Sequence, residues 1–102
     1  MDEKEFSKRL ASLREKKGVS ARDMSLSIGQ NPGYINNIET GKSMPSLSGF
    51  FYICEYLGIT PSAFLDSENE NPACFAELFR DLKRLNDQQL ANITSIIKDM
   101  IR

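Results

Sequence analysis

The chain has 102 residues, enough for one compact domain with a short extension. It has 13 basic and 14 acidic side chains but no histidine, so it lacks the commonest general base and the commonest zinc ligand. Two cysteines, Cys54 and Cys74, are too few for a metal knuckle or a disulfide framework. We therefore expect neither an enzyme nor a cofactor or metal site.

No segment is apolar enough to span a membrane, and no signal-type segment opens the sequence, so we expect a cytoplasmic protein without membrane contact. The charge is unevenly placed. Residues 1–19 hold six basic and four acidic side chains, whereas residues 66–102 hold five basic and seven acidic ones. This mild basic excess at the start does not by itself indicate a nucleic-acid partner.

Every segment is predicted to be helical, because no run of residues alternates between apolar and polar side chains with a period of two. Phe6, Leu10 and Leu13 recur at helical spacing after Asp2, and Gly18 predicts the end of this first helix. The second helix is predicted from Ser20, with Asp23 at capping spacing, to Gly29; its inward residues are Met24 and Ile28.

Asn31 predicts the cap of the third helix, and Pro32 its first residue; we expect it to reach about Thr40 with Tyr34, Ile35 and Ile38 as its apolar face. A fourth helix is predicted from Pro45–Ser46 to Gly58. Its expected inward residues are Leu47, Phe50, Ile53, Cys54 and Leu57. Thr60–Pro61 then predicts a short fifth helix that carries Phe64 and Leu65.

The polar run DSENEN at 66–71 predicts a linker, and residues 72–102 predict two amphipathic helices with Asn86 and Gln89 as the cap between them. Their apolar stripes are Phe75, Leu78, Phe79 and Leu82, and then Leu90, Ile93, Ile97 and Met100. This tail has more apolar surface than a lone hairpin covers. It either folds back on the domain or pairs with a second copy, and the polar linker favours the homodimer.

Seven short motifs follow one another along the chain: Leu13–Arg14, Gly18-x-Ser20, Ile28–Gly29, Tyr34–Ile35, Ile38–Glu39-x-Gly41–Lys42, Pro45–Ser46–Leu47 and Leu57–Gly58–Ile59. In their order and spacing, these sequence landmarks make roughly residues 5–65 resemble the Cro/cI-type (Xre-like) helix-turn-helix regulators. The resemblance implies an all-α protein: a five-helix, lambda-repressor-like DNA-binding domain at 1–65, followed by the linker and a C-terminal helical hairpin.

The resemblance also implies that Asn31–Thr40 is the recognition helix and that Arg14 pairs with Glu39; two independent surface charges are the alternative. Ser25 stands where the family usually has alanine, at the crossing of the second and third helices. The positions implied to contact DNA phosphates are Ser20, Ala21, Arg22, Asn31, Thr40, Lys42 and Ser43.

Base reading departs from the family pattern, since Pro32 and Gly33 replace long polar side chains and Ala21 replaces a frequent glutamine. The remaining candidates are Asn37, Asn36, Gly33, Tyr34 and Gln30. Asn37 is the first choice because an asparagine can bond adenine N6 and N7 together. Alternatively, both asparagines are only solvated polar residues.

The sequence thus predicts a regulator of transcription, more often a repressor in this family, which binds a palindromic operator in double-stranded DNA as a dimer. A second hypothesis is an antitoxin or mobile-element switch protein whose tail binds a partner protein. The net charge of −1 and the missing glutamines favour that alternative.

Overall fold

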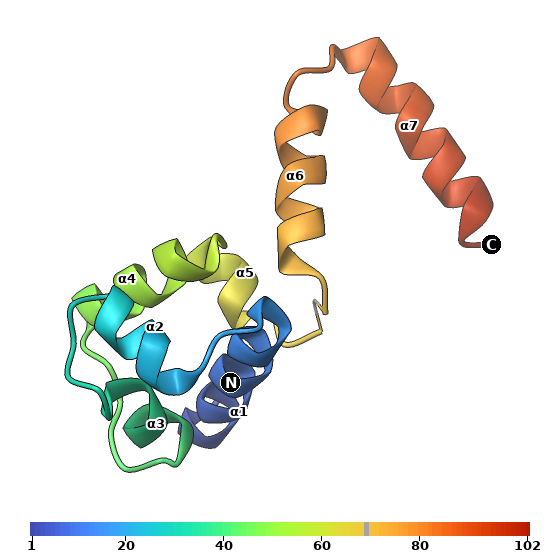
Figure 1. The fold of residues 1–102 in the computed structure, drawn as a ribbon. Coiled ribbons are helices and arrows are strands. Elements are labelled where there is room, and N and C mark those ends of the chain that lie inside the picture. Colours follow the sequence, from blue (N-terminus) through green and yellow to red (C-terminus); the bar gives the residue numbers. More distant parts are fainter. Residues whose placement is uncertain (69) are drawn as a thin grey trace. The chain divides into compact units, whose positions relative to one another are not determined.

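The computed structural model describes residues 1–68 and 70–102. These residues form seven helices and no strand, which confirms the all-α prediction. Five helices precede the tail: α1 (Glu3–Lys17), α2 (Ala21–Ser27), α3 (Tyr34–Glu39), α4 (Leu47–Leu57) and α5 (Pro61–Leu65). Two more follow, α6 (Pro72–Leu82) and α7 (Asp87–Met100) (Figure 1). The chain divides into two compact units, Met1–Pro72 and Ala73–Arg102.

Most helices follow a capping residue, whose side-chain oxygen accepts a hydrogen bond from the backbone N–H three residues later. In the first unit the capping residues are Asp2, Ser20, Ser46 and Thr60, and the distances from the backbone nitrogen to the side-chain oxygen are 2.8–3.0 Å. Each satisfies one of the N–H groups that a helix start leaves unpaired. Gly18 ends α1 with φ +80°, a conformation that side chains with a Cβ rarely adopt. These local signals explain why the helices of this unit start and stop close to the predicted residues.

The core of the first unit lies between α1 and the four shorter helices. Its buried apolar residues are Phe6, Leu10, Leu13, Met24, Ile35, Ile38, Ile53, Cys54, Ile59 and Phe64. The ring centroids of Phe6 and Phe64 are 4.8 Å apart, and Phe50 meets Phe64 edge-on at 5.2 Å. Aromatic pairs in this geometry stabilise the core beyond the contribution from burial of the three rings. Burial also raises the pKa of the Cys54 thiol to about 11, which makes it a poor nucleophile.

One residue predicted to face inward is exposed instead. Leu47 is 68% exposed, and it is the first residue of α4. The core covers the middle of this helix, where Ile53 is completely buried. The inward prediction was therefore wrong at this end of α4.

Two buried polar side chains attach α1 to distant parts of the chain. The hydroxyl of Ser7 donates to the backbone oxygen of Ile38 at 2.7 Å. The guanidinium of Arg9, only 7% exposed, donates to the backbone oxygens of Phe64 at 2.8 Å and Ala63 at 2.9 Å. It thus satisfies carbonyls at the end of α5, where a positive charge also suits the helix dipole.

In the second unit, Asn86 and Gln89 form the predicted cap of α7. The side chain of Asn86 accepts from Gln89 N at 2.8 Å, and the side chain of Gln89 accepts from Asn86 N at 3.0 Å. Many large apolar side chains of α6 and α7 are exposed, namely Phe75, Leu78, Phe79, Leu90, Ile93, Ile96, Ile97 and Met100. Among the described residues, no helix is long and apolar enough to cross a membrane.

Candidate nucleic-acid interface

Helices α2 and α3 are joined by a tight turn at Gly29. This residue has φ +75°, and the next N–H, that of Gln30, donates back to the oxygen of Ser25 at 2.9 Å. A residue with a Cβ would be strained at this φ. Ser25 is fully buried, as expected for the small residue where the two helices cross. Figure 1 shows α2 and α3 as consecutive short helices on one side of the first unit.

The third helix begins later than predicted, at Tyr34 instead of Pro32. Asn31 makes a turn in front of it: its side-chain oxygen accepts from Gly33 N at 3.0 Å, and its backbone oxygen accepts from Tyr34 N at 3.1 Å. This turn takes up the residues expected to form the first helical turn. Asn31 therefore caps the turn that leads into α3 instead of the helix itself.

One face of α3 is buried and the opposite face is open. Ile35 and Ile38 are completely buried, whereas Asn36 is exposed and Asn37 is half-buried. At about 100° per residue, both asparagines lie well away from the two isoleucines. Gly33 lies beside Asn37, since a Cβ built on Gly33 would be 3.8 Å from Asn37 Nδ2. The open face thus holds three of the five predicted base readers; Gln30, in the preceding turn, is half-buried.

Tyr34 is turned toward the core and α4. Its half-buried ring packs against the core cluster, and a Cβ built on Gly49 would lie 2.5 Å from its hydroxyl oxygen. Burial raises the pKa of Tyr34. Gly49 thus allows the phenol to approach α4 closely, and this orientation weighs against base reading by Tyr34.

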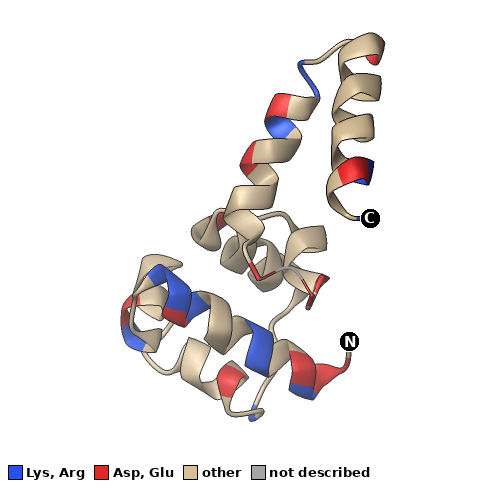
Figure 2. Cartoon of the chain, turned by 90° about the vertical axis from the view of Figure 1, so that its right-hand side faces the viewer, with Lys and Arg blue, Asp and Glu red and all other residues tan. Residues whose placement is uncertain are grey.

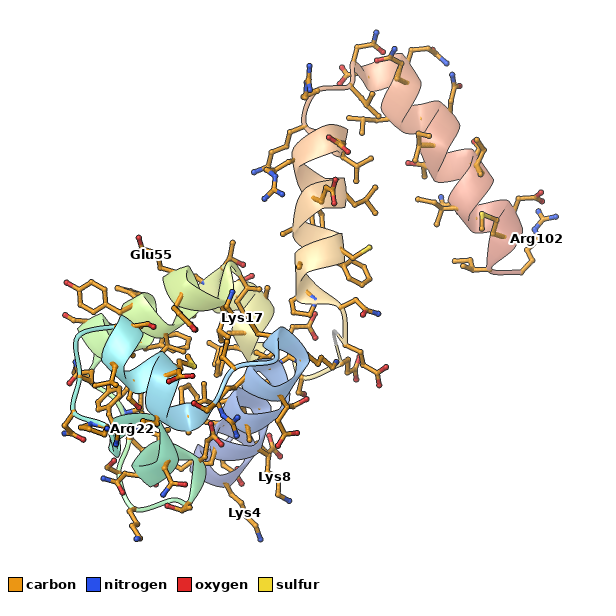
Figure 3. The ribbon with its side chains drawn as sticks, viewed as in Figure 1. Lys4, Lys8, Lys17, Arg22, Glu55 and Arg102 are labelled. Atoms are coloured by element: carbon orange, nitrogen blue, oxygen red, sulfur yellow. The ribbon has the colours of Figure 1, made fainter. Side chains whose placement is uncertain are left out.

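The residues predicted to contact phosphates differ in which hydrogen-bond donors they could offer to a phosphate. At the start of α2, Ser20 caps Asp23 N, and Arg22 carries an exposed side chain (Figure 3). After α3, the backbone N–H groups of Lys42 and Ser43 both donate to the oxygen of Asn37, at 2.8 and 3.2 Å. A phosphate at this loop would therefore meet the exposed Lys42 and Ser43 side chains rather than these amides.

The hydroxyl of Thr40 also has a partner already, since it donates to the oxygen of Asn36 at 2.8 Å. It would have to rotate before it could donate to a phosphate. Asn31 keeps its amide nitrogen as a donor because only its side-chain oxygen is used by Gly33. These phosphate and base contacts remain predictions.

Arg14 and Glu39 form a bidentate ion pair between α1 and the end of α3. Arg14 Nε donates to Glu39 Oε2 at 2.7 Å, and Arg14 Nη2 donates to Oε1 at 2.9 Å. Arg14 Nη1 also donates to the oxygen of Val19 at 2.9 Å. The side chains are 17% and 10% exposed, and the hydrogen bonds that Arg14 donates to Glu39 raise the pKa of Arg14. The pair therefore fixes the end of α3 to α1.

Residues 7–70, more than half of the chain, match the helix-turn-helix domain family. The chain belongs to this family. It is of the Cro/cI (Xre-like) type, as the sequence landmarks predict, and this is a DNA-binding family. No curated protein and no solved structure matches the chain.

In this helix-turn-helix domain, we expect the Arg14–Glu39 pair to have a measurable effect on stability. Changing either residue alone to Ala is expected to lower the free energy of unfolding by about 1–4 kcal/mol, because the other charge stays partly buried without its partner. The double variant is expected to lose less than the sum of the two single losses. Denaturant unfolding of the four proteins measures this coupling, and additive losses would contradict an interaction between the two side chains.

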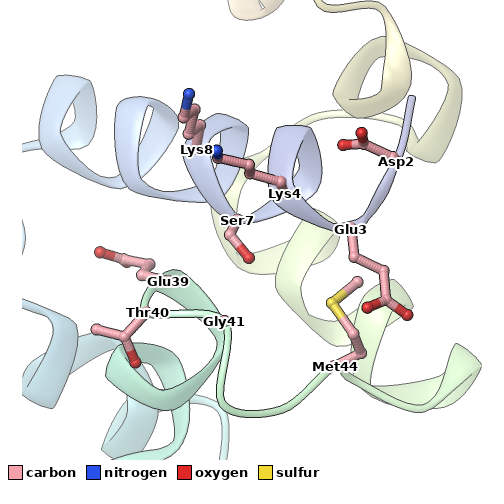
Figure 4. Close-up of a pocket in the computed structure, with 9 residues that line it drawn as sticks. All are labelled: Asp2, Glu3, Lys4, Ser7, Lys8, Glu39, Thr40, Gly41 and Met44. Atoms are coloured by element: carbon pink, nitrogen blue, oxygen red, sulfur yellow. The ribbon is translucent and has the colours of Figure 1, made fainter.

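Two further cations near the interface were missed by sequence reasoning. Lys4 and Lys8, one turn apart on α1, line a hollow together with Thr40 and Gly41 (Figure 4). This hollow lies beside the loop that carries Lys42. The available signal was the spacing of the two lysines on the polar side of the first helix, in the basic part of the chain.

Proposed function

We propose that the chain is a sequence-specific transcriptional repressor that binds a palindromic operator as a homodimer. The observation that carries the proposal is the open face of α3 in a helix-turn-helix domain. Asn36 and Asn37 lie on this face, opposite the buried Ile35 and Ile38. An α-helix with such a face fits the major groove, where asparagine pairs best with adenine. A dimer bound over a promoter would exclude the polymerase, and its place of action would be the cytoplasm.

Affinity would come from cations on both sides of this face. Arg22 stands at the start of α2, and Lys42 follows α3. Phosphate contacts by these residues would fix the register of the domain on the duplex, while the asparagines would read sequence. The net charge of −1 does not oppose this arrangement, because the acidic excess lies mainly at 66–102.

The tail supports a homodimer through the spacing of its apolar residues. Phe75, Leu78, Leu82 and Leu85 are separated by three, four and three residues, and Leu90, Ile93, Ile97 and Met100 repeat that spacing. It is the pattern of helices that pack in left-handed bundles. Two copies of the hairpin, four helices in all, would form such a bundle around a two-fold axis.

The charges of α7 fit the same arrangement. No charged residue lies between Asp87 and Lys98, and Figure 2 shows charge only near the two ends of this helix. In addition, Ile96 and Ile101 widen the apolar face beyond one stripe, and both are exposed. A face of this width suits a helix with two neighbours, one from its own hairpin and one from the second copy.

Selection of bound sites from a random pool of DNA tests the proposal. The full chain would be used at low and at moderate salt, because non-specific binding dominates when salt is low. Enrichment of a palindrome is the expected result. DNA binding without an enriched sequence would contradict the proposal of a sequence-specific repressor.

That result would favour the second candidate, an antitoxin or switch protein whose tail binds a different protein. The exposed apolar residues of α6 and α7 are the observation in its favour, since a partner helix could cover them as well as a second copy.

A further inference from the structure

The recognition helix α3 has no side-chain cap of its own. It has only six residues, and Gly33 stands at its cap position. Isolated helices of this length are not stable in water, so α3 depends on its surroundings. Its first N–H groups nevertheless have partners. Asn31 accepts from Gly33 N and Tyr34 N, and the N–H of Ile35 donates to the hydroxyl oxygen of Ser25 at 2.9 Å.

Ser25 thus caps α3 from the neighbouring helix. It is fully buried, and its hydroxyl also donates to the oxygen of Ala21 at 2.7 Å. One hydroxyl therefore links the second residue of α3 to the first residue of α2. A hydroxyl that donates and accepts at the same time polarises, which strengthens both bonds. An alanine at this position would provide neither bond.

This link joins the two parts of the interface that have different tasks. The start of α2, Ser20 to Arg22, is the proposed phosphate anchor, and the open face of α3 is the proposed base reader. Buried contacts of Met24, Ile35 and Ile38 also hold the helices together, but apolar contact has no preferred direction. A hydrogen bond has one, so it restricts sliding and rotation of α3 against α2.

We propose that Ser25 is a positioning residue, which holds the base-reading face of α3 at a fixed offset from the phosphate-binding start of α2. The inference rests on the proposed function. Phosphate contacts set the register of a domain on DNA, and base contacts discriminate only if the reading face keeps its place relative to them. Loss of the link weakens discrimination between sequences while phosphate binding persists.

The test is Ser25→Ala in the full chain. The affinity for the selected operator relative to random DNA is expected to fall about 3- to 10-fold, the range that one neutral hydrogen bond supports, with random DNA bound as before. Two readouts need no DNA. Hydrogen exchange of the Ile35 amide is expected to become faster, and the amide resonances of Asn36 and Asn37 are expected to shift in NMR spectra.

Thr60→Ala is the matched control. Thr60 also accepts a helix N–H, that of Ala63 at 3.0 Å, but in α5. The Thr60→Ala substitution is expected to lower stability without any change in the ratio of operator affinity to random-DNA affinity or in the Asn36 and Asn37 resonances. Three results would overturn the role of Ser25: an unchanged ratio, an equal fall for Thr60→Ala, or unaltered Asn36 and Asn37 resonances. A pool that yields no operator defeats the proposed function, and the exchange and resonance measurements then still decide whether Ser25 positions α3.

Discussion

Deletion of residues 67–102 is expected to leave a folded monomer that binds the operator at least about 100-fold more weakly than the full chain. The first unit keeps its own core when the tail is absent, because Phe64 and the rest of the buried cluster lie within residues 1–66. A monomer meets only one half-site at a time and loses the effective concentration that links two half-sites in a dimer. Light scattering and operator titration measure the two effects.

Single substitutions in α7 separate dimerisation from simple loss of chain. Ile97→Asp places a charge on the proposed contact face, whereas Ser95→Asp places the same charge about 200° away around the helix. Only Ile97→Asp is expected to give a monomer, because its carboxylate would be buried between the two copies. A dimer that survives both Ile97→Asp and the deletion would show that the chains associate through the first unit instead.

The sequence allowed prediction of those features that depend on neighbouring residues. Ser20 and Asp23, or Asn86 and Gln89, are three positions apart, and the capping bond between such residues depends little on the rest of the fold. The buried stripes of α1 followed in the same way from helical periodicity. The start of α3 was wrong by two residues because the side chain of Asn31 binds Gly33 N and makes a turn there.

Features that depend on distant residues could not be predicted in this way. Ser7 bonds the oxygen of Ile38, and Arg9 bonds that of Phe64, over separations of 31 and 55 residues. Before the fold is known, each reads as an ordinary polar residue on a helix. The bond between Ser25 and Ile35 N is another example, since the sequence indicated only that a small residue was needed at that crossing. The orientation of Tyr34 toward Gly49 likewise depends on how α3 meets α4.

Asn37→Ala and Lys42→Ala are expected to weaken DNA binding in different ways. Asn37 lies on the open face of α3 beside Gly33, and Lys42 lies in the exposed loop after it. Loss of the asparagine is expected to cost about 1–3 kcal/mol on the selected operator and little on random DNA, with relaxed preference at one base pair in each half-site. Loss of the lysine is expected to weaken binding to both DNAs alike and to lower the salt slope by about one per subunit.

Titrations of both DNAs at several salt concentrations measure this contrast, and thermal melts show whether either change acts through stability. Both melts are expected to stay close to that of the unaltered chain. Asn37 uses its backbone oxygen to hold Lys42 N and Ser43 N, and substitution of its side chain leaves this oxygen in place. Should Asn37→Ala keep the operator-to-random ratio while the fold survives, Asn37 is not a base reader. Recognition would then rest on Asn36, on close approach of the Gly33 backbone, or on the shape of the DNA.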